Sequence, residues 1–137
     1  MRLRPHLNFD GKCEAAFKFY ENCLGGKITF MMTYGDSPMA AQTQPDWQKK
    51  IIHATLAVGD QVLTGADAPP GYYQKPQGFS VTLNVSDAAE ADRIFNALSE
   101  KGVVQMPVQE TFWALRFGMF VDQFGTPWMI NCGKPQA

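Results

Sequence analysis

The sequence has 137 residues, of which 45% are hydrophobic and 18% charged, a composition typical of one folded domain or of two fused half-size units. The net charge is -1 and the pI about 6.1, so the chain lacks the basic character that binding to nucleic acid or to an anionic membrane surface usually needs. No apolar run reaches the roughly 18 to 20 residues that span a bilayer, and residues 1–11 contain no apolar stretch typical of a secretory signal. We therefore expect a cytoplasmic protein without nucleic acid or membrane as partner.

The first half of the chain predicts one strand, one helix and three further strands. Apolar and polar residues alternate over 3–9, which predicts a strand, and Ala16, Phe19, Tyr20 and Cys23 recur at helical spacing behind it. Gly25 and Gly26 mark the end of this helix, where we expect left-handed backbone. Strands are then predicted over 27–34, 50–58 and 61–66, and the last two are joined by a tight turn at Gly59 and Asp60.

The second half repeats this order after a segment, 68–78, whose three prolines and two glycines are typical of a linker. A strand is predicted over 79–85. A helix follows with Ala91, Ile94, Phe95 and Leu98 on its apolar face, with Ser86 or Asp87 as its N-cap and Gly102 in left-handed backbone at its end. Three more strands are predicted over 103–111, 114–122 and 127–132.

The two halves also share residues when the chain is shifted by 76 positions, and this internal repeat determines the predicted fold. The identical pairs are Leu7 and Leu83, Asn8 and Asn84, Glu14 and Glu90, Ala15 and Ala91, Phe19 and Phe95, and Gly26 and Gly102. We therefore predict an α+β fold of one domain, 1–137, with two βαβββ modules (1–67 and 79–137) that form curved mixed sheets around a cavity. The first module has an extra loop, 35–49, for which we consider a lid, a dimer contact or a disordered surface loop.

The polar faces of the two first strands are the natural walls of such a cavity. Leu7, Phe9 and their counterparts Val81 and Leu83 must pack on the helices, so the polar residues between them point to the opposite side of each sheet. These polar residues are Arg4, His6 and Asn8 in the first module and Ser80, Thr82 and Asn84 in the second.

Two motifs carry a family resemblance that covers nearly the whole chain. Asp10-Gly11, Glu14-Ala15, Phe19-Tyr20 and Leu24-Gly25-Gly26 follow the first strand, and this front motif resembles the glyoxalase, bleomycin-resistance and extradiol-dioxygenase (vicinal oxygen chelate) superfamily. The segments 110–113, 117–118 and 122–131 resemble its PhnB-like branch, whose members are often labelled as 3-demethylubiquinone 3-methyltransferase-like. The resemblance implies paired βαβββ modules, two curved mixed sheets and a homodimer.

The resemblance also implies a divalent metal, held by His or Glu on the first and last strands of each module. Here the first-strand positions fall at Arg4 and Ser80, with His6 the nearest possible ligand, and the last-strand positions fall at Leu63 or Thr64 and at Met129. A divalent site needs several converging donors, so we expect no metal and no other cofactor. The chain also lacks any G-x-G turn and any alternating βαβα order, which argues against a doubly wound S-adenosylmethionine enzyme.

Candidate site residues follow from the strand faces and from the pair Phe112 and Trp113, which we call the aromatic tail motif. For catalysis we consider Glu110 and His53 as general bases, against a structural role in which Glu110 pairs with Arg116 or Arg4 and His53 is simply hydrogen-bonded. For ligand binding we expect Arg4, His6, Asn8, Tyr34, Thr55, Phe112, Trp113 and Arg116.

Three functions remain open from the sequence. The first is a metal-free protein that binds a small molecule, the second is an enzyme of the isomerase, lyase or hydrolase type, and the third is a structural module whose cavity is filled by its own side chains. The three cysteines, Cys13, Cys23 and Cys132, form no C-x-x-C motif and are expected to be reduced and buried. We expect a homodimer, because two open curved sheets have edges that a partner would cover.

Overall fold

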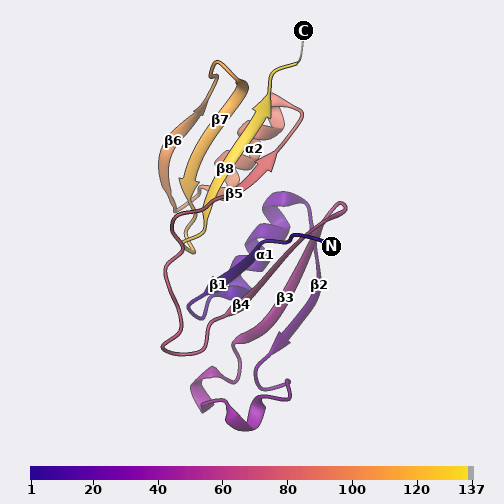
Figure 1. Cartoon of the computed structure of the whole chain (residues 1–137), viewed down its shortest axis with the longest axis vertical. Helices are drawn as coiled ribbons and strands as arrows, with labels where there is room; N and C mark the ends of the chain where they lie inside the picture. Colours follow the sequence, from indigo (N-terminus) through magenta and orange to yellow (C-terminus); the bar gives the residue numbers. More distant parts are fainter. Residues whose placement is uncertain (136–137) are drawn as a thin grey trace. The chain divides into compact units, whose positions relative to one another are not determined.

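The computed structural model of the chain describes residues 1–135, which form two compact units divided between Gln74 and Lys75, within the predicted linker. Each unit contains one four-stranded mixed sheet and one α-helix that contacts one face of that sheet (Figure 1). Within residues 1–135 no helix has both the length and the apolar character that crossing a membrane would require.

The first unit has the predicted element order. Its elements are β1 (His6–Phe9), α1 (Cys13–Leu24), β2 (Lys27–Thr33), β3 (Ile51–Val58) and β4 (Gln61–Asp67). The strands lie in the order β1-β4-β3-β2, and β1 pairs with β4 in parallel while the other neighbours are antiparallel. The crossover through α1 is what allows β1 and β4 to run in the same direction.

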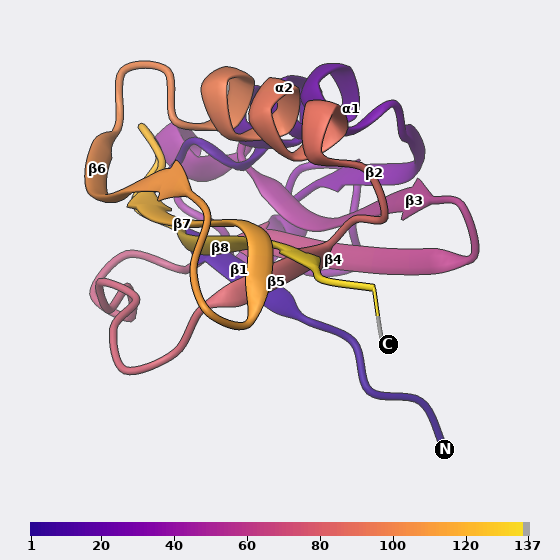
Figure 2. The same ribbon diagram turned by 90° about the horizontal axis from the view of Figure 1, so that it is seen from above.

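The second unit has the same topology. Its elements are β5 (Val81–Asn84), α2 (Ala88–Leu98), β6 (Val103–Gln109), β7 (Ala114–Val121) and β8 (Pro127–Gly133), in the sheet order β5-β8-β7-β6 with β5 and β8 parallel. Figure 2 shows α2 lying across β7 and β8, the two strands that it contacts. The prediction of an α+β fold with two βαβββ copies is therefore confirmed at the level of secondary structure and pairing.

Both first strands are shorter than predicted, and this removes two candidate positions from the sheets. Strand β1 begins at His6 and β5 at Val81, so Arg4 and Ser80 precede the strands on which we expected them. Proline limits the pairing in each case, because it has no N–H to donate to a neighbouring strand. Pro5 precedes β1, and Pro127 is the first residue of β8, the strand that pairs with β5.

Each helix buries one apolar stripe against its sheet. In α2 the buried residues include the four predicted ones, Ala91, Ile94, Phe95 and Leu98. In α1 the buried residues are Cys13, Ala16, Phe17, Tyr20 and Cys23. The prediction of Phe19 was wrong: this ring is half-buried, and Phe17 takes the core position, with its ring edge-on to Phe9 at 6.2 Å between centroids.

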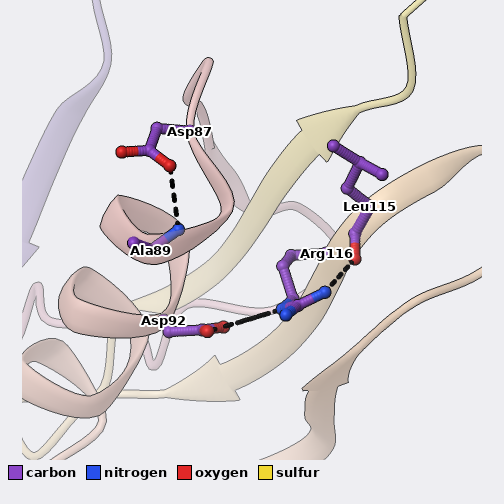
Figure 3. Close-up of polar contacts among 5 residues, drawn as sticks. All are labelled: Asp87, Ala89, Asp92, Leu115 and Arg116. Atoms are coloured by element: carbon purple, nitrogen blue, oxygen red, sulfur yellow. Dashed lines mark hydrogen bonds and ion pairs between the residues drawn. The ribbon is translucent and has the colours of Figure 1, made fainter.

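The helix ends distinguish the two copies. Asp87 is the N-cap of α2, and its Oδ1 accepts the Ala89 N–H at 3.1 Å (Figure 3). Gly25 has left-handed backbone as predicted, but in the second copy the positive φ of 60° belongs to Lys101, so the prediction for Gly102 was wrong. Gly102 and Gly26 share a different reason for being glycine, which is that a Cβ atom there would collide with the carbonyl oxygens of Val121 and Ala57.

The extra loop 35–49 is compact and hydrogen-bonded to itself. It contains two short 3₁₀ turns, η1 (Ala40–Gln42) and η2 (Pro45–Trp47), which lie at one end of the first sheet (Figure 1). The Gln48 side chain donates to the carbonyl oxygens of Ala40 and Thr43 at 2.9 and 2.8 Å. The expectation of a disordered loop is therefore wrong, because polar side chains within the loop satisfy its backbone.

Candidate functional site

The first unit gathers its polar and aromatic side chains on the face of the sheet that lies away from α1, which we call the open face. The opposite face is marked by Gly65, which lies against the Phe17 ring of α1, and by its strand partner Ala54. Strand alternation then places the neighbouring residues on the open face. They are His6 and Asn8 of β1, Thr64 of β4, His53 and Thr55 of β3, and Phe30 and Met32 of β2.

Three rings lie in succession across this open face, and we call them the His6–His53–Phe30 ring row. The His6 and His53 rings are stacked with centroids 6.1 Å apart and planes 21° from parallel. The Phe30 ring lies on the other neighbouring strand of β3, with its centroid 5.9 Å from that of His53. His6 and Phe30 are exposed and His53 is partly so, which leaves ring surface available to a flat molecule.

Each of the two histidines has a ring nitrogen in contact with a threonine hydroxyl. The Nδ1 atom of His6 lies 2.8 Å from the Thr64 hydroxyl oxygen, and that hydroxyl donates to the Pro5 carbonyl oxygen at 3.3 Å. The Thr55 hydroxyl lies 3.4 Å from Nε2 of His53. Partial burial, and secondly the nearby His53, lower the pKa of His6, so its imidazole is neutral at about pH 7.

The corresponding face of the second unit carries asparagine amides and a methionine in place of histidines. The Thr82 hydroxyl lies 3.9 Å from the sulfur of Met129, and the Asn131 amide donates to Asn84 Oδ1 at 3.1 Å. Both histidines of the chain lie in the first unit, so groups able to exchange protons near pH 7 are concentrated there.

The aromatic tail motif lies at the end of the second sheet. Phe112 and Trp113 follow β6, with ring centroids 4.7 Å apart, and Trp113 packs edge-on against Phe117 of β7 at 5.2 Å. Phe112 is 88% exposed and Trp113 44% exposed, so these rings form a surface cluster.

Of the residues predicted to bind a ligand, the structure brings three together with the candidate base His53. His6, Asn8, Thr55 and His53 share the open face of the first unit. Tyr34 lies in the interior instead, where its hydroxyl donates to the Asp67 carbonyl oxygen at 2.7 Å. Burial first, and Asp67 second, raise the pKa of Tyr34, which makes it a structural group.

Arg116 and Glu110 make structural ion pairs rather than contacts on the open face. Arg116 reaches α2, where its Nε lies 3.1 Å from Asp92, and its Nη1 donates to the Leu115 carbonyl oxygen at 2.7 Å (Figure 3). Glu110 is exposed and pairs with Lys134 at 3.1 Å. We did not predict Lys134 as the partner of Glu110. The two residues follow different strands, β8 and β6, and only the assembly of those strands into one sheet brings them together.

Two members of the site have little signal in the sequence. Phe30 lies in the run KITFMMT, whose apolar residues occur on both faces, so alternation does not identify its side. At Thr64 the sequence suggests only a position for a metal ligand, and its bond to His6 joins residues 58 positions apart.

The donor set does not fit the divalent metal that the resemblance implies. The paired positions on the first and last strands hold His6 with Thr64 and Thr82 with Met129. Throughout residues 1–135 no group of three or more His, Cys, Asp or Glu side chains is placed to hold a metal ion. Neither pair supplies the several converging donors that such a cation needs, so no chemistry through a metal follows from these residues.

Comparison with known proteins now decides the family. A family model described as 3-demethylubiquinone-9 3-methyltransferase matches residues 1–131. The chain belongs to this family. Protein YjdN of Escherichia coli strain K12 is a relative. The two sequences are 34% identical over an alignment of 146 positions, which covers 99% of this chain and 98% of YjdN.

Solved structures of similar proteins confirm the predicted α+β fold of this family member. Protein PA1353 from Pseudomonas aeruginosa is 47% identical, with a TM-score of 0.90, over 98% of this chain and 99% of its own. A PhnB protein from Bacillus cereus, described as a putative 3-demethylubiquinone-9 3-methyltransferase, is 21% identical with a TM-score of 0.81, over 97% and 100% of the two chains. A glyoxylase/bleomycin resistance protein/dioxygenase domain from Frankia sp. EAN1pec is 12% identical with a TM-score of 0.65, over 98% of both chains, and shows the shared fold.

Proposed function

We propose that this family member binds a small, flat, largely apolar molecule on the open face of its first unit, without a metal. The observation that carries the proposal is the His6–His53–Phe30 ring row, in which three rings with exposed surface cross adjacent strands. Binding sites for small molecules combine aromatic and apolar surface with a few placed polar groups, and on this face three rings lie beside the Thr64 and Thr55 hydroxyls.

The chemistry of the ring row favours a flat and uncharged ligand. Each aromatic pair adds about 0.5–1.5 kcal/mol beyond the area that it buries, so a planar ring has two partners in His53 and Phe30. His6 is neutral at about pH 7, because partial burial and His53 lower its pKa, and it therefore provides no positive charge to attract an anion. Threonine hydroxyls beside both imidazoles orient the rings and leave few polar atoms that a ligand must match.

A thermal-shift and calorimetric screen with flat aromatic and amphipathic compounds tests the proposal. We expect saturable stabilisation by at least one compound, weakened in Phe30→Ala and His53→Ala. Phe112→Ala is the matched control, because it also removes an exposed ring but lies in the second unit. If no compound stabilises the protein, or if Phe112→Ala weakens binding as much as Phe30→Ala does, the ring row is not the binding site.

The metal-free part of the proposal rests on the donor set and has its own test. We expect titration with nickel, zinc, iron or manganese to give no tight, stoichiometric stabilisation. Saturable stabilisation that disappears in His6→Ala would contradict this part and would point to a metal site on the same face.

Catalysis is the second candidate function, and the neutral His6 imidazole favours it. A neutral imidazole can accept a proton from a bound molecule, and the His53 ring lies beside it. Once a ligand is identified, its turnover would be lowered by His6→Gln or His53→Ala and unchanged by Glu110→Gln, because Glu110 is exposed and paired with Lys134. Full activity in both histidine variants would exclude this candidate.

We also propose that the protein is a cytoplasmic homodimer. Strand β6 is an edge strand and exposes Val103 and Val104, which are 67% and 45% exposed. Exposed apolar edges are sites where a second chain can pair. Light scattering at micromolar concentration should give the mass of two chains, and a clean monomer would contradict the proposal.

A further inference from the structure

We infer that His6 selects ligands that carry a hydroxyl group on a flat ring, a phenol or an enol, because Thr64 holds its imidazole with the lone pair on Nε2. This inference rests on the proposed binding site and specifies the class of molecule that the site takes.

We assign the proton of His6 from the hydrogen bonds that the Thr64 hydroxyl makes. A threonine hydroxyl has one hydrogen to donate, while a carbonyl oxygen can only accept. The Thr64 hydroxyl donates its hydrogen to the Pro5 carbonyl oxygen at 3.3 Å. The 2.8 Å contact between the Thr64 oxygen and Nδ1 of His6 is then a bond in which Nδ1–H donates.

The second nitrogen of His6 is therefore an acceptor. A neutral imidazole with its hydrogen on Nδ1 has its lone pair on Nε2. Within residues 1–135 His6 makes one side-chain hydrogen bond, the one to Thr64, and Nε2 has no partner. The exposed edge of the ring thus presents an acceptor next to the stacked His53 ring.

These features specify a ligand of one chemical class. A flat ring that stacks on the ring row can place a hydroxyl hydrogen on Nε2, and a phenol or enol supplies both parts. A methyl ether of the same ring has no hydrogen to donate. A carboxylate brings a negative charge against the Nε2 lone pair, so it is disfavoured.

The tautomer can be measured without any ligand. In nitrogen-15 labelled protein at about pH 7, we expect long-range proton–nitrogen spectra to show His6 protonated at Nδ1. Thr64→Val should remove this preference and Thr64→Ser should restore it. Thr55→Val, on the same face but beside His53, is the matched control and should leave His6 unchanged. A wild-type His6 protonated at Nε2, or a preference that Thr64→Val does not alter, would overturn the inference.

Selectivity is measured with three naphthalenes that differ only in one substituent at the same ring position. We expect naphthol to bind about fivefold more tightly than methoxynaphthalene, since one hydrogen bond is at stake, and naphthoate to bind most weakly. In His6→Phe, which keeps a ring but removes the acceptor, the first difference should vanish. Equal binding of naphthol and methoxynaphthalene would overturn the inference and leave the proposed site intact. Binding of none of the three would overturn hydroxyl selection, and failure of the wider screen as well would reject the proposed site.

Discussion

The carboxylate of Asp67, the last residue of β4, accepts the backbone N–H of Cys13, the first residue of α1, at 2.9 Å. Its second oxygen accepts the N–H of Ile51 at 2.8 Å, and the side chain is only 1% exposed. One buried carboxylate therefore joins the start of the helix to two strands, including β3, which carries His53.

Asp67→Asn is expected to destabilise the protein by about 2–3 kcal/mol, because the amide can accept at one of the two sites and turns a donor toward the other buried N–H. Urea unfolding would measure this loss. Asp60→Asn, in the exposed turn between β3 and β4, is the control and should change the free energy of unfolding by less than about 0.5 kcal/mol. Similar losses in the two variants would contradict the role of Asp67.

A second buried carboxylate has a comparable role in the second unit. Asp122 accepts the indole N–H of Trp128 at 2.8 Å and the N–H groups of Phe124 and Thr126 within the turn before β8. Trp128→Phe should cost about 1–3 kcal/mol, because it removes a donor from a buried carboxylate and leaves unfilled volume. Trp113→Phe, at a half-exposed ring, should cost clearly less in the same denaturation experiment.

Gly102→Ala is expected to destabilise the second unit by at least about 2 kcal/mol, because the added Cβ would meet the Val121 carbonyl and force the backbone apart. Lys101→Gly should be neutral or slightly stabilising, since Lys101 has a φ of 60°, a conformation that glycine adopts without steric cost. Differential scanning calorimetry of the two variants tests both statements. A greater loss of stability in Lys101→Gly than in Gly102→Ala would reverse our assignment of roles.

The pH dependence of stability should contain a contribution from His6. Its pKa is lowered in the folded state, so between that value and the ordinary value of about 6.5 the unfolded chain binds more protons than the folded chain. The contribution is present above the unfolded pKa and is lost as the pH falls through the folded pKa. His6→Gln should therefore flatten the decline in stability on acidification below about pH 6.5. An unchanged slope would show that the ring is not perturbed.

The cysteines should be unreactive in the folded protein. Cys13, Cys23 and Cys132 are all buried, and burial followed by Asp67 raises the pKa of the Cys13 thiol, which disfavours the reactive thiolate. A thiol reagent should label none of the three under native conditions and all three in denaturant. Rapid native labelling of any of them would contradict the reading of these thiols as structural.

Much of the fold could be predicted because its signals are local. Alternation and helical spacing, each repeated after 76 positions, placed most elements to within two residues and both helices on the correct side of their strands. The errors occurred where a neighbour far along the chain intervenes. Pro127 on β8 limits the start of β5, and close approach to Val121 requires glycine at 102.

The candidate site was predicted only in part, because which residues meet on it depends on strand pairing. Arg116 illustrates this, since a bulge between Ala114 and Arg116 puts it opposite the buried Cys132 and directs its side chain to α2. The bond from His6 to Thr64 likewise requires β1 and β4 to pair in parallel.

The sequence by itself determined the repeated βαβββ order, since hydrophobic periodicity is a property of neighbouring residues. It also placed His6 and His53 on the polar faces of their strands. Only the tertiary structure decided that the two rings stack, that Phe30 extends the row and that Thr64 orients His6. Those relations depend on the register between strands, which is set by the packing of whole elements against one another.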